Sequence, residues 1–299
     1  MQDERLAWCR SVLGPCERLG DDERIHGRAS VLGVQTPTER FYAKFYTDPS
    51  DWVREVHGYE QWAQGFGCAT PHLVAVSSSD PLAILVTALP GTTARDADLG
   101  FAARLDVWRH AGQALLPFHA QAQGEFFGPC RRDGSPEGEY VTDGADYVER
   151  EFVRLEREAA EAGLLNGDEA ALVVKARRRV SVFADEPPVP CHRDYGPDNW
   201  LVLPQQGLTG VIDFEFSAWD VRAVEFSRYP HWEWIDQPSL VDALLSGYGW
   251  QHPPAHWPAQ LGVLRVQYAL GAVVWGTANS FFGFAAEGHR ALALLQIAF

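Results

Sequence analysis

The chain has 299 residues, enough for one large domain or two modest ones that share a cleft. Its formal net charge of −15 opposes binding to nucleic acid, because that affinity depends on lysine and arginine side chains that neutralise phosphates. No apolar run approaches the roughly 18–20 residues that cross a bilayer, and the first residues lack the basic-then-apolar order of a secretory signal. The five cysteines are scattered without metal-ligand spacing. We therefore expect no zinc site, no membrane, no nucleic-acid partner and a reducing, cytoplasmic location.

The first 90 residues predict mixed α and β structure. Asp48 and Pro49 open a helix, since aspartate suits the N-cap and proline suits the first helical position. A polar turn separates two later strands, and Pro90-Gly91 ends the second of them. Besides the helix after Pro49, the expected elements are a helix over 4–13 and strands over 30–34, 41–46, 72–77 and 82–89.

Beyond Gly91 the apolar residues recur at helical intervals. Helices are expected over 101–119, near 145–164 and 168–184, and from about 221 onward, with a loop and short strands over 187–214. The sequence thus predicts an α+β fold with two lobes. A small N-terminal antiparallel β lobe (1–90) with one key helix is expected to precede a larger, mainly helical lobe (91–299).

Two segments late in the chain carry the strongest chemical signal. In the first, residues 191–202, a His-Arg-Asp triplet ending at Asp194 is followed five residues later by Asn199. The second, residues 210–215, is an apolar strand that leads into Asp213. This order matches the pattern of a kinase catalytic loop and its metal-binding aspartate.

The spacing of these residues has a geometric reason. Phosphoryl transfer needs a carboxylate beside the attacking hydroxyl and oxygen ligands for Mg²⁺ on the phosphates. Gly196-Pro197 lets the loop turn, so that Asp194 and Asn199 point into one pocket. A pair of strands then returns Asp213 to the same place.

A second signal lies on the helix after Pro49. Glu55 falls within an apolar stripe of that helix, where a carboxylate is costly unless it is paired. Lys44, one of only two lysines in the chain, lies on the preceding strand and is the natural partner. A kinase needs such a strand lysine, paired with a helix glutamate, to hold the α- and β-phosphates. Glu60 lies further off the stripe and is the alternative partner.

The two motif segments resemble the aminoglycoside phosphotransferase and choline kinase superfamily, which comprises small-molecule relatives of protein kinases. That family typically has His-Gly-Asp in its catalytic loop, whereas this chain has Arg193 at the glycine position. Glu215 stands where protein kinases have the glycine of Asp-Phe-Gly, and no Ala-Pro-Glu segment follows. Both features favour a small substrate over a protein.

The resemblance implies a bilobal, protein-kinase-like fold and roles for individual residues. Asp194 is expected to be the catalytic base, Asn199 and Asp213 magnesium ligands, and His192 a structural residue. The expected cofactors are Mg²⁺ and ATP, with GTP as the alternative nucleotide. No Gly-x-Gly-x-x-Gly motif is present, so the phosphate-covering segment is expected near Ser30, where a plain hairpin turn is the other interpretation. The run 87–91 resembles the family's hinge, which implies adenine binding by the backbone of Ala88 and Leu89.

Acceptor contacts are expected from the helical lobe. We name the apolar strand that leads into Asp213 the metal strand. Acidic and aromatic side chains gather around and after it, and such groups suit a cationic ligand through charge-assisted hydrogen bonds and cation–π contacts. The candidates are Asp198, Glu215, Asp220, Glu225, Trp232, Glu233 and Asp236. Core packing or solvation is the competing interpretation for each of them. Asp220 or Glu225 is also a candidate for the residue that anchors the following helix.

The leading hypothesis is ATP-dependent phosphorylation of an antibiotic hydroxyl, with an aminoglycoside, a cationic peptide or a nucleoside antibiotic as acceptor. A metabolic kinase acting on choline, a sugar or an amino alcohol is the alternative. A nucleotide-binding pseudokinase is disfavoured because every chemical position is filled, and a protein kinase is disfavoured because an activation segment is missing. We expect a monomer or a weak homodimer.

Overall fold

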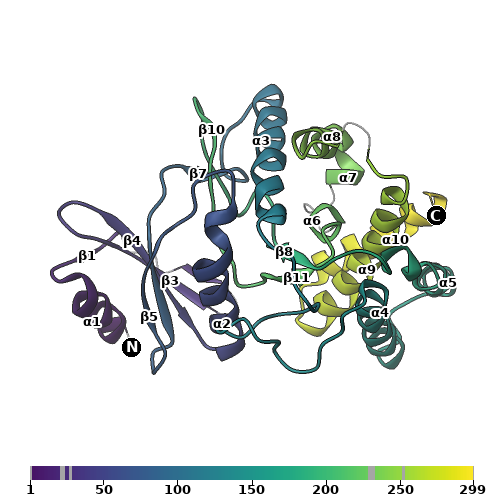
Figure 1. The fold of residues 1–299 in the computed structure, drawn as a ribbon, viewed down its shortest axis with the longest axis horizontal. Helices are drawn as coiled ribbons and strands as arrows, with labels where there is room; N and C mark the ends of the chain where they lie inside the picture. Colours follow the sequence, from purple (N-terminus) through teal and green to yellow (C-terminus); the bar gives the residue numbers. More distant parts are fainter. Residues whose placement is uncertain (1, 21–23, 27–28, 228–232, 251–252, 299) are drawn as a thin grey trace.

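The structure is a computed structural model that describes residues 2–20, 24–26, 29–227, 233–250 and 253–298. It confirms the predicted α+β architecture, with an N-terminal antiparallel sheet on the left of Figure 1 and a larger helical part on the right. Within these residues, no helix is long and apolar enough to span a lipid bilayer.

Six described strands form the N-terminal sheet, in the order β1-β3-β4-β6-β5 with β2 added beside β3. All the pairings are antiparallel. The strands are β1 (Glu17–Arg18), β2 (Arg24–His26), β3 (Ala29–Gln35), β4 (Arg40–Tyr46), β5 (Leu73–Ser77) and β6 (Ala83–Thr87).

Alternation along β4 assigns its side chains to two faces of the sheet. Phe41, Ala43 and Phe45 belong to a core cluster with Cys9 of helix α1 (Gln2–Leu13). The intervening residue Lys44 therefore points to the opposite face of the sheet, where α2 lies (Figure 1). The aromatic-rich sequence of β4 thus directs one lysine toward the middle of the molecule.

Helix α2 (Pro49–His57) begins as the sequence predicts. The Asp48 carboxylate accepts the Ser50 N–H at 2.9 Å, and Pro49 occupies the first turn. The helix continues as a π-helix, η1 (Gly58–Trp62), followed by a short 3₁₀ turn, η2 (Ala63–Gly65). A Cβ at Gly58 would lie 2.8 Å from Phe214 Cβ. This segment therefore passes directly over residues 213–215, which we name the Asp-Phe-Glu turn.

A small second sheet and a strand pair support the catalytic loop. The sheet has the order β10-β9-β7, and β11 pairs with β8. Figure 1 shows β7 and β10 beside the N-terminal end of α3. The strands are β7 (Thr92–Thr93), β8 (Val189–Cys191), β9 (Trp200–Leu203), β10 (Gly207–Val211) and β11 (Ala218–Asp220).

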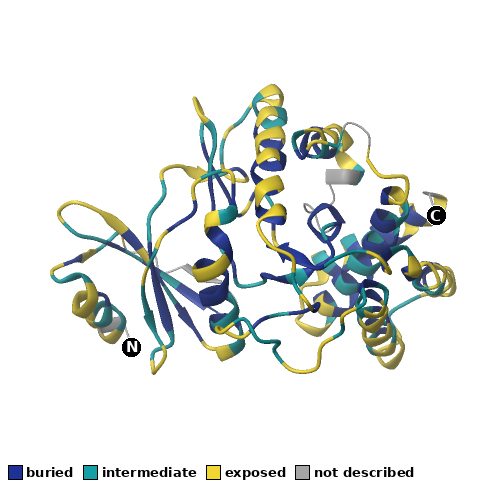
Figure 2. Cartoon of the chain, in the orientation of Figure 1, coloured by how far each residue is buried: buried dark blue, intermediate teal, exposed yellow. Residues whose placement is uncertain are grey.

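Helices make up the rest of the molecule, and Figure 2 shows α3 with buried and exposed stripes along its length. The predicted segment 168–184 divides into α5 and a 3₁₀ turn, η3 (Val180–Phe183), instead of forming one helix. The helices are α3 (Phe101–Ala120), α4 (Gly144–Glu161), α5 (Gly167–Arg177), α6 (Val224–Ser227), α7 (Glu233–Asp236), α8 (Pro238–Gly247), α9 (Trp257–Ala278) and α10 (Phe282–Ala298).

Helices α3 and α8 touch through their backbones. A Cβ at Gly112 would lie 2.0 Å from the Leu244 carbonyl oxygen, and one at Gly247 would lie 1.9 Å from the Arg109 carbonyl oxygen.

We expect Gly112→Ala to lower the free energy of unfolding by about 1–3 kcal/mol, because the two helices must separate to admit the methyl group. Urea denaturation measures the change. Gly283→Ala is the control, since a Cβ there meets nothing within 4 Å, and equal losses in both variants would contradict the packing argument.

Candidate active site

The loop after β8 is held by a buried carboxylate and a buried histidine. Glu225 on α6 accepts backbone N–H groups from His192 and Arg193. The His192 ring donates from Nε2 to the Ile212 carbonyl at 3.0 Å, and its Nδ1 accepts the Asp194 N–H at 3.3 Å. These contacts fix the loop between α6 and β10 while the Asp194 side chain stays exposed.

Asp194 and Asn199 lie in direct contact, as their spacing predicts. Asn199 donates from Nδ2 to the Asp194 carbonyl oxygen and to its carboxylate, both at 2.9 Å. Because that nitrogen faces Asp194, Oδ1 is the atom of Asn199 that a metal ion would use. An exposed carboxylate with its orientation fixed by an amide suits a general base.

Asp213 follows β10 in a left-handed conformation, with φ of 70°. The Ile212 N–H donates to the Asn199 carbonyl at 3.0 Å, so the metal strand and the catalytic loop are joined one residue before Asp213. A non-glycine residue at positive φ is strained and needs strong local contacts. Lys44 supplies one, with Nζ 2.7 Å from Asp213 Oδ1.

Three carboxylates surround the Lys44 ammonium. Besides Asp213, Glu55 and Glu215 each lie 2.8 Å from Nζ. The Tyr46 hydroxyl donates to Glu55 at 2.5 Å. Lys44 therefore pairs with Glu55, the predicted partner, while Glu60 lies elsewhere and pairs with Arg132.

The protonation states follow from this crowding. Burial lowers the pKa of Lys44, but Asp213, Glu55 and Glu215 outweigh it and hold that pKa well above its usual value. Burial raises the pKa of Glu55 to about 7, against the opposing effect of Lys44. Burial also acts to raise the pKa of Asp213, yet the Lys44 ammonium brings the net shift downward. Burial and the neighbouring Asp213 carboxylate also raise the pKa of Glu215, against the opposing effect of Lys44.

The grouping of carboxylates suits a divalent cation. Carboxylate oxygens of Glu55, Asp213 and Glu215 lie within 4.8 Å of one another. Oxygen donors of this kind are what Mg²⁺ prefers, and Mg²⁺ usually retains water and binds substrate phosphates as well. Asp213 is one of these three carboxylates, and the hydrogen bond from Ile212 to Asn199 places the Asn199 backbone beside the same segment.

The structure brings together only part of the expected nucleotide contacts. In the β3–β4 register Ser30 lies opposite Phe45, so its side chain shares the α1 face of the sheet with Phe45 and points away from Lys44. The buried Ser30 hydroxyl has no hydrogen-bond partner among the described residues, and it is not part of the Lys44 site. The Ala88 N–H donates to the Arg40 carbonyl at 2.9 Å, so its carbonyl is the group left for a base. Leu89 packs close to Gly210 on the metal strand.

The predicted acceptor residues are not gathered in one place. Glu215 contacts Lys44, and Glu225 is buried under the catalytic loop. Asp198 pairs with Arg95 and Asp236 pairs with Arg290, both as exposed ion pairs. Trp232 and the side chain of Glu233 lie outside the described residues.

Asp220, the remaining candidate, belongs to a network beside the catalytic loop. Its carboxylate lies 3.0 Å from Arg193 Nε and accepts the Tyr147 hydroxyl at 3.2 Å. Arg193 has φ of 64°, a conformation that glycine adopts without strain. Glycine, which is typical at this position in the superfamily that the motif resembles, would adopt this backbone conformation without strain. In this chain Arg193 occupies the position and forms an ion pair with the buried Asp220.

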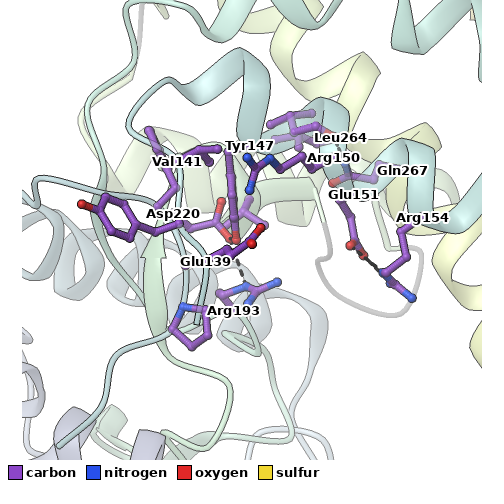
Figure 3. Close-up of a pocket in the computed structure, with 16 residues that line it drawn as sticks. Glu139, Val141, Tyr147, Arg150, Glu151, Arg154, Arg193, Asp220, Leu264 and Gln267 are labelled. Carbon is purple, nitrogen blue, oxygen red and sulfur yellow. Dashed lines mark hydrogen bonds and ion pairs between the residues drawn. The ribbon is translucent and has the colours of Figure 1, made fainter. Parts of the chain in front are cut away.

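This network forms one wall of a cavity of about 260 Å³ between the 127–141 segment, α4 and α9 (Figure 3). Tyr140 and Tyr147 line it together with Gln267 of α9. The lining is charged but balanced, with Glu139, Glu151 and Asp220 against Arg150, Arg154 and Arg193. Figure 3 shows Arg193 directed at Asp220, with Glu139 and Arg150 near Tyr147.

Sequence reasoning missed most of this cavity. Tyr147, Arg150, Glu151 and Arg154 recur at intervals of three and four residues, so they share one face of α4. The spacing of these four residues could have indicated from the sequence that they share one surface. No sequence pattern indicates that Glu139 and Gln267 join them, because these two come from a loop and a distant helix.

The chain belongs to the phosphotransferase enzyme family, whose sequence profile matches residues 24–259. It is accordingly a phosphotransferase. No significant match was found among curated protein sequences.

Solved structures of aminoglycoside phosphotransferases share the fold. A thermostable mutant of APH(4)-Ia in a ternary complex with ADP and hygromycin B is similar with a TM-score of 0.73 and 15% identity, covering 98% of this chain and 97% of that one. APH(2″)-IIIa in complex with GDP and kanamycin is similar with a TM-score of 0.67 and 15% identity, covering 99% of both chains. At this identity the likeness establishes the kinase-like fold alone.

Arg193 offers a test of how the catalytic loop is held. We expect Arg193→Ala to lower the free energy of unfolding by about 2–4 kcal/mol, since it leaves the Asp220 carboxylate buried without its guanidinium. Arg193→Gly should cost about 1 kcal/mol less, because glycine has no strain at positive φ. Urea denaturation of both variants checks the order; an alanine variant as stable as the glycine variant would contradict it.

Proposed function

We infer that this protein transfers the γ-phosphoryl group of ATP to a hydroxyl of a small molecule. The observation that carries the proposal is that Lys44 contacts Asp213 and that Asn199 contacts the exposed Asp194, while a backbone hydrogen bond from Ile212 to Asn199 joins the two pairs. Phosphoryl transfer is catalysed mainly by positioning and by stabilisation of charge, and this set supplies both. The nucleotide would lie between the 1–90 lobe and the 91–299 lobe, with GTP as the alternative donor.

Each group has a distinct part in the proposal. Asp194 accepts the proton of the acceptor hydroxyl as that oxygen attacks. Lys44, positioned by Glu55, holds the α- and β-phosphates. Asp213 and Asn199 would hold Mg²⁺, which neutralises charge on the phosphates when it is bound.

The acceptor is proposed to occupy the cavity that Arg193 and α4 line, because Arg193 is adjacent in the chain to Asp194. The solved relatives include complexes with hygromycin B and with kanamycin, which supports an antibiotic acceptor. The balanced charge of the lining favours an acceptor with hydroxyls and few amino groups over a strong polycation.

The decisive experiment measures phosphate transfer from labelled ATP with Mg²⁺ to a panel of aminoglycoside, peptide and nucleoside antibiotics, with choline, sugars and amino alcohols as the metabolic arm. We expect one antibiotic class to be phosphorylated. Asp194→Ala should lower kcat by about 10²–10⁴-fold while nucleotide affinity stays near the native value. Transfer to a metabolite alone would replace the antibiotic proposal, and unchanged turnover in the variant would refute Asp194 as the base.

The acceptor cavity has a separate test. Glu139→Gln should raise the KM for the acceptor about tenfold, since it removes a charge-assisted contact, and should leave the KM for ATP unchanged. Glu149→Gln is the matched control, because Glu149 is exposed on α4 and outside the cavity lining. Equal kinetic constants in the two variants would place the acceptor elsewhere.

A further inference from the structure

A hairpin of the helical part reaches across to the helix that carries Glu55. We name residues 127–141 the bridging hairpin. Its ends pair through Phe127 and Val141, and Cys130 pairs with Pro136 nearer the tip. Gly128 pairs with Trp219 of β11, with backbone hydrogen bonds of 2.8 and 3.0 Å. The base of the bridging hairpin is therefore attached to the sheet that supports the catalytic loop.

The tip of the bridging hairpin binds α2 and its π-helical extension. Arg132 donates to both oxygens of Glu60, at 3.1 and 2.6 Å. Arg54 donates to Glu137 at 2.9 Å, and His57 Nδ1 lies 3.3 Å from the Arg132 carbonyl oxygen. Two ion pairs of opposite direction thus join the two elements, one with the arginine on the hairpin and one with the arginine on the helix.

These contacts bear on the nucleotide site because α2 also carries Glu55. Glu55 is buried and lies 2.8 Å from Lys44 Nζ, so a shift of α2 by an ångström or two would open that ion pair. The side chains of Arg132 and Glu60 are 46% and 28% exposed, and those of Arg54 and Glu137 are each 26% exposed. Ion pairs this exposed contribute little to folding, so their main effect is on where α2 sits.

We propose that Arg132 and Glu137 are positioning residues for the nucleotide site, acting through α2 on the Lys44–Glu55 pair. The proposal rests on the proposed function, since it assigns these residues to the binding of the phosphate donor. It also gives the bridging hairpin two tasks, because Phe127, Glu139 and Tyr140 line the acceptor cavity.

The test measures affinity for Mg·ADP by calorimetry, which needs no acceptor. The double variant Arg132→Gln, Glu137→Gln should bind Mg·ADP about three- to thirtyfold more weakly than the native protein. Its KM for ATP should rise by a similar factor, with a smaller change in kcat. Arg109→Gln is the matched control, since it breaks an exposed ion pair within α3 and should bind as the native protein does.

Charge reversal separates positioning from general damage. Arg132→Glu alone should weaken Mg·ADP binding, and Glu60→Arg added to it should restore most of the native affinity by reforming the pair in reverse. Native affinity in the double glutamine variant, or no rescue by the reversal, would overturn the proposal. A native protein that binds neither Mg·ADP nor Mg·GDP would instead contradict the proposed function, and this inference with it.

Discussion

The ammonium group of Lys44 lies at the centre of this molecule. It is one positive charge among three carboxylates. Glu55 comes from α2, Asp213 from the end of the metal strand and Glu215 from the turn that follows it. A buried carboxylate without a partner is costly. The sheet, α2 and the Asp-Phe-Glu turn must therefore converge on this one nitrogen.

That convergence explains several local features that look unrelated in the sequence. The alternation of β4 turns Lys44 away from α1, Gly58 lets the helix pass over Phe214, and Asp213 adopts a left-handed backbone. Each feature brings a charge or an element closer to the same point. The carboxylate oxygens gathered there are the donors that the proposed function assigns to Mg²⁺ and, through it, to a nucleotide.

Sequence reasoning succeeded where the chemistry is local. The contact of Asp194 with Asn199 follows from five residues of spacing, and the contact of Lys44 with Glu55 follows from a charge within an apolar stripe. It failed for contacts between distant segments. Glu215 lies 171 residues from its partner Lys44, and Arg132 lies 72 from Glu60, so no periodicity in the chain connects them. Glu225 was ambiguous for the same reason, since only the fold shows that it lies under the catalytic loop.

The position of the bridging hairpin within the chain has an evolutionary consequence. The hairpin and α4, which form much of the cavity, are encoded between α3 and β8, whereas the catalytic loop and the metal strand follow later. With the acceptor in this cavity, as proposed above, its recognition can diverge by exchange of one continuous stretch of gene while the residues of the catalytic loop and the metal strand stay unchanged. Such an exchange is constrained at its tip, because a transplanted segment must present charges complementary to Arg54 and Glu60 of its new host.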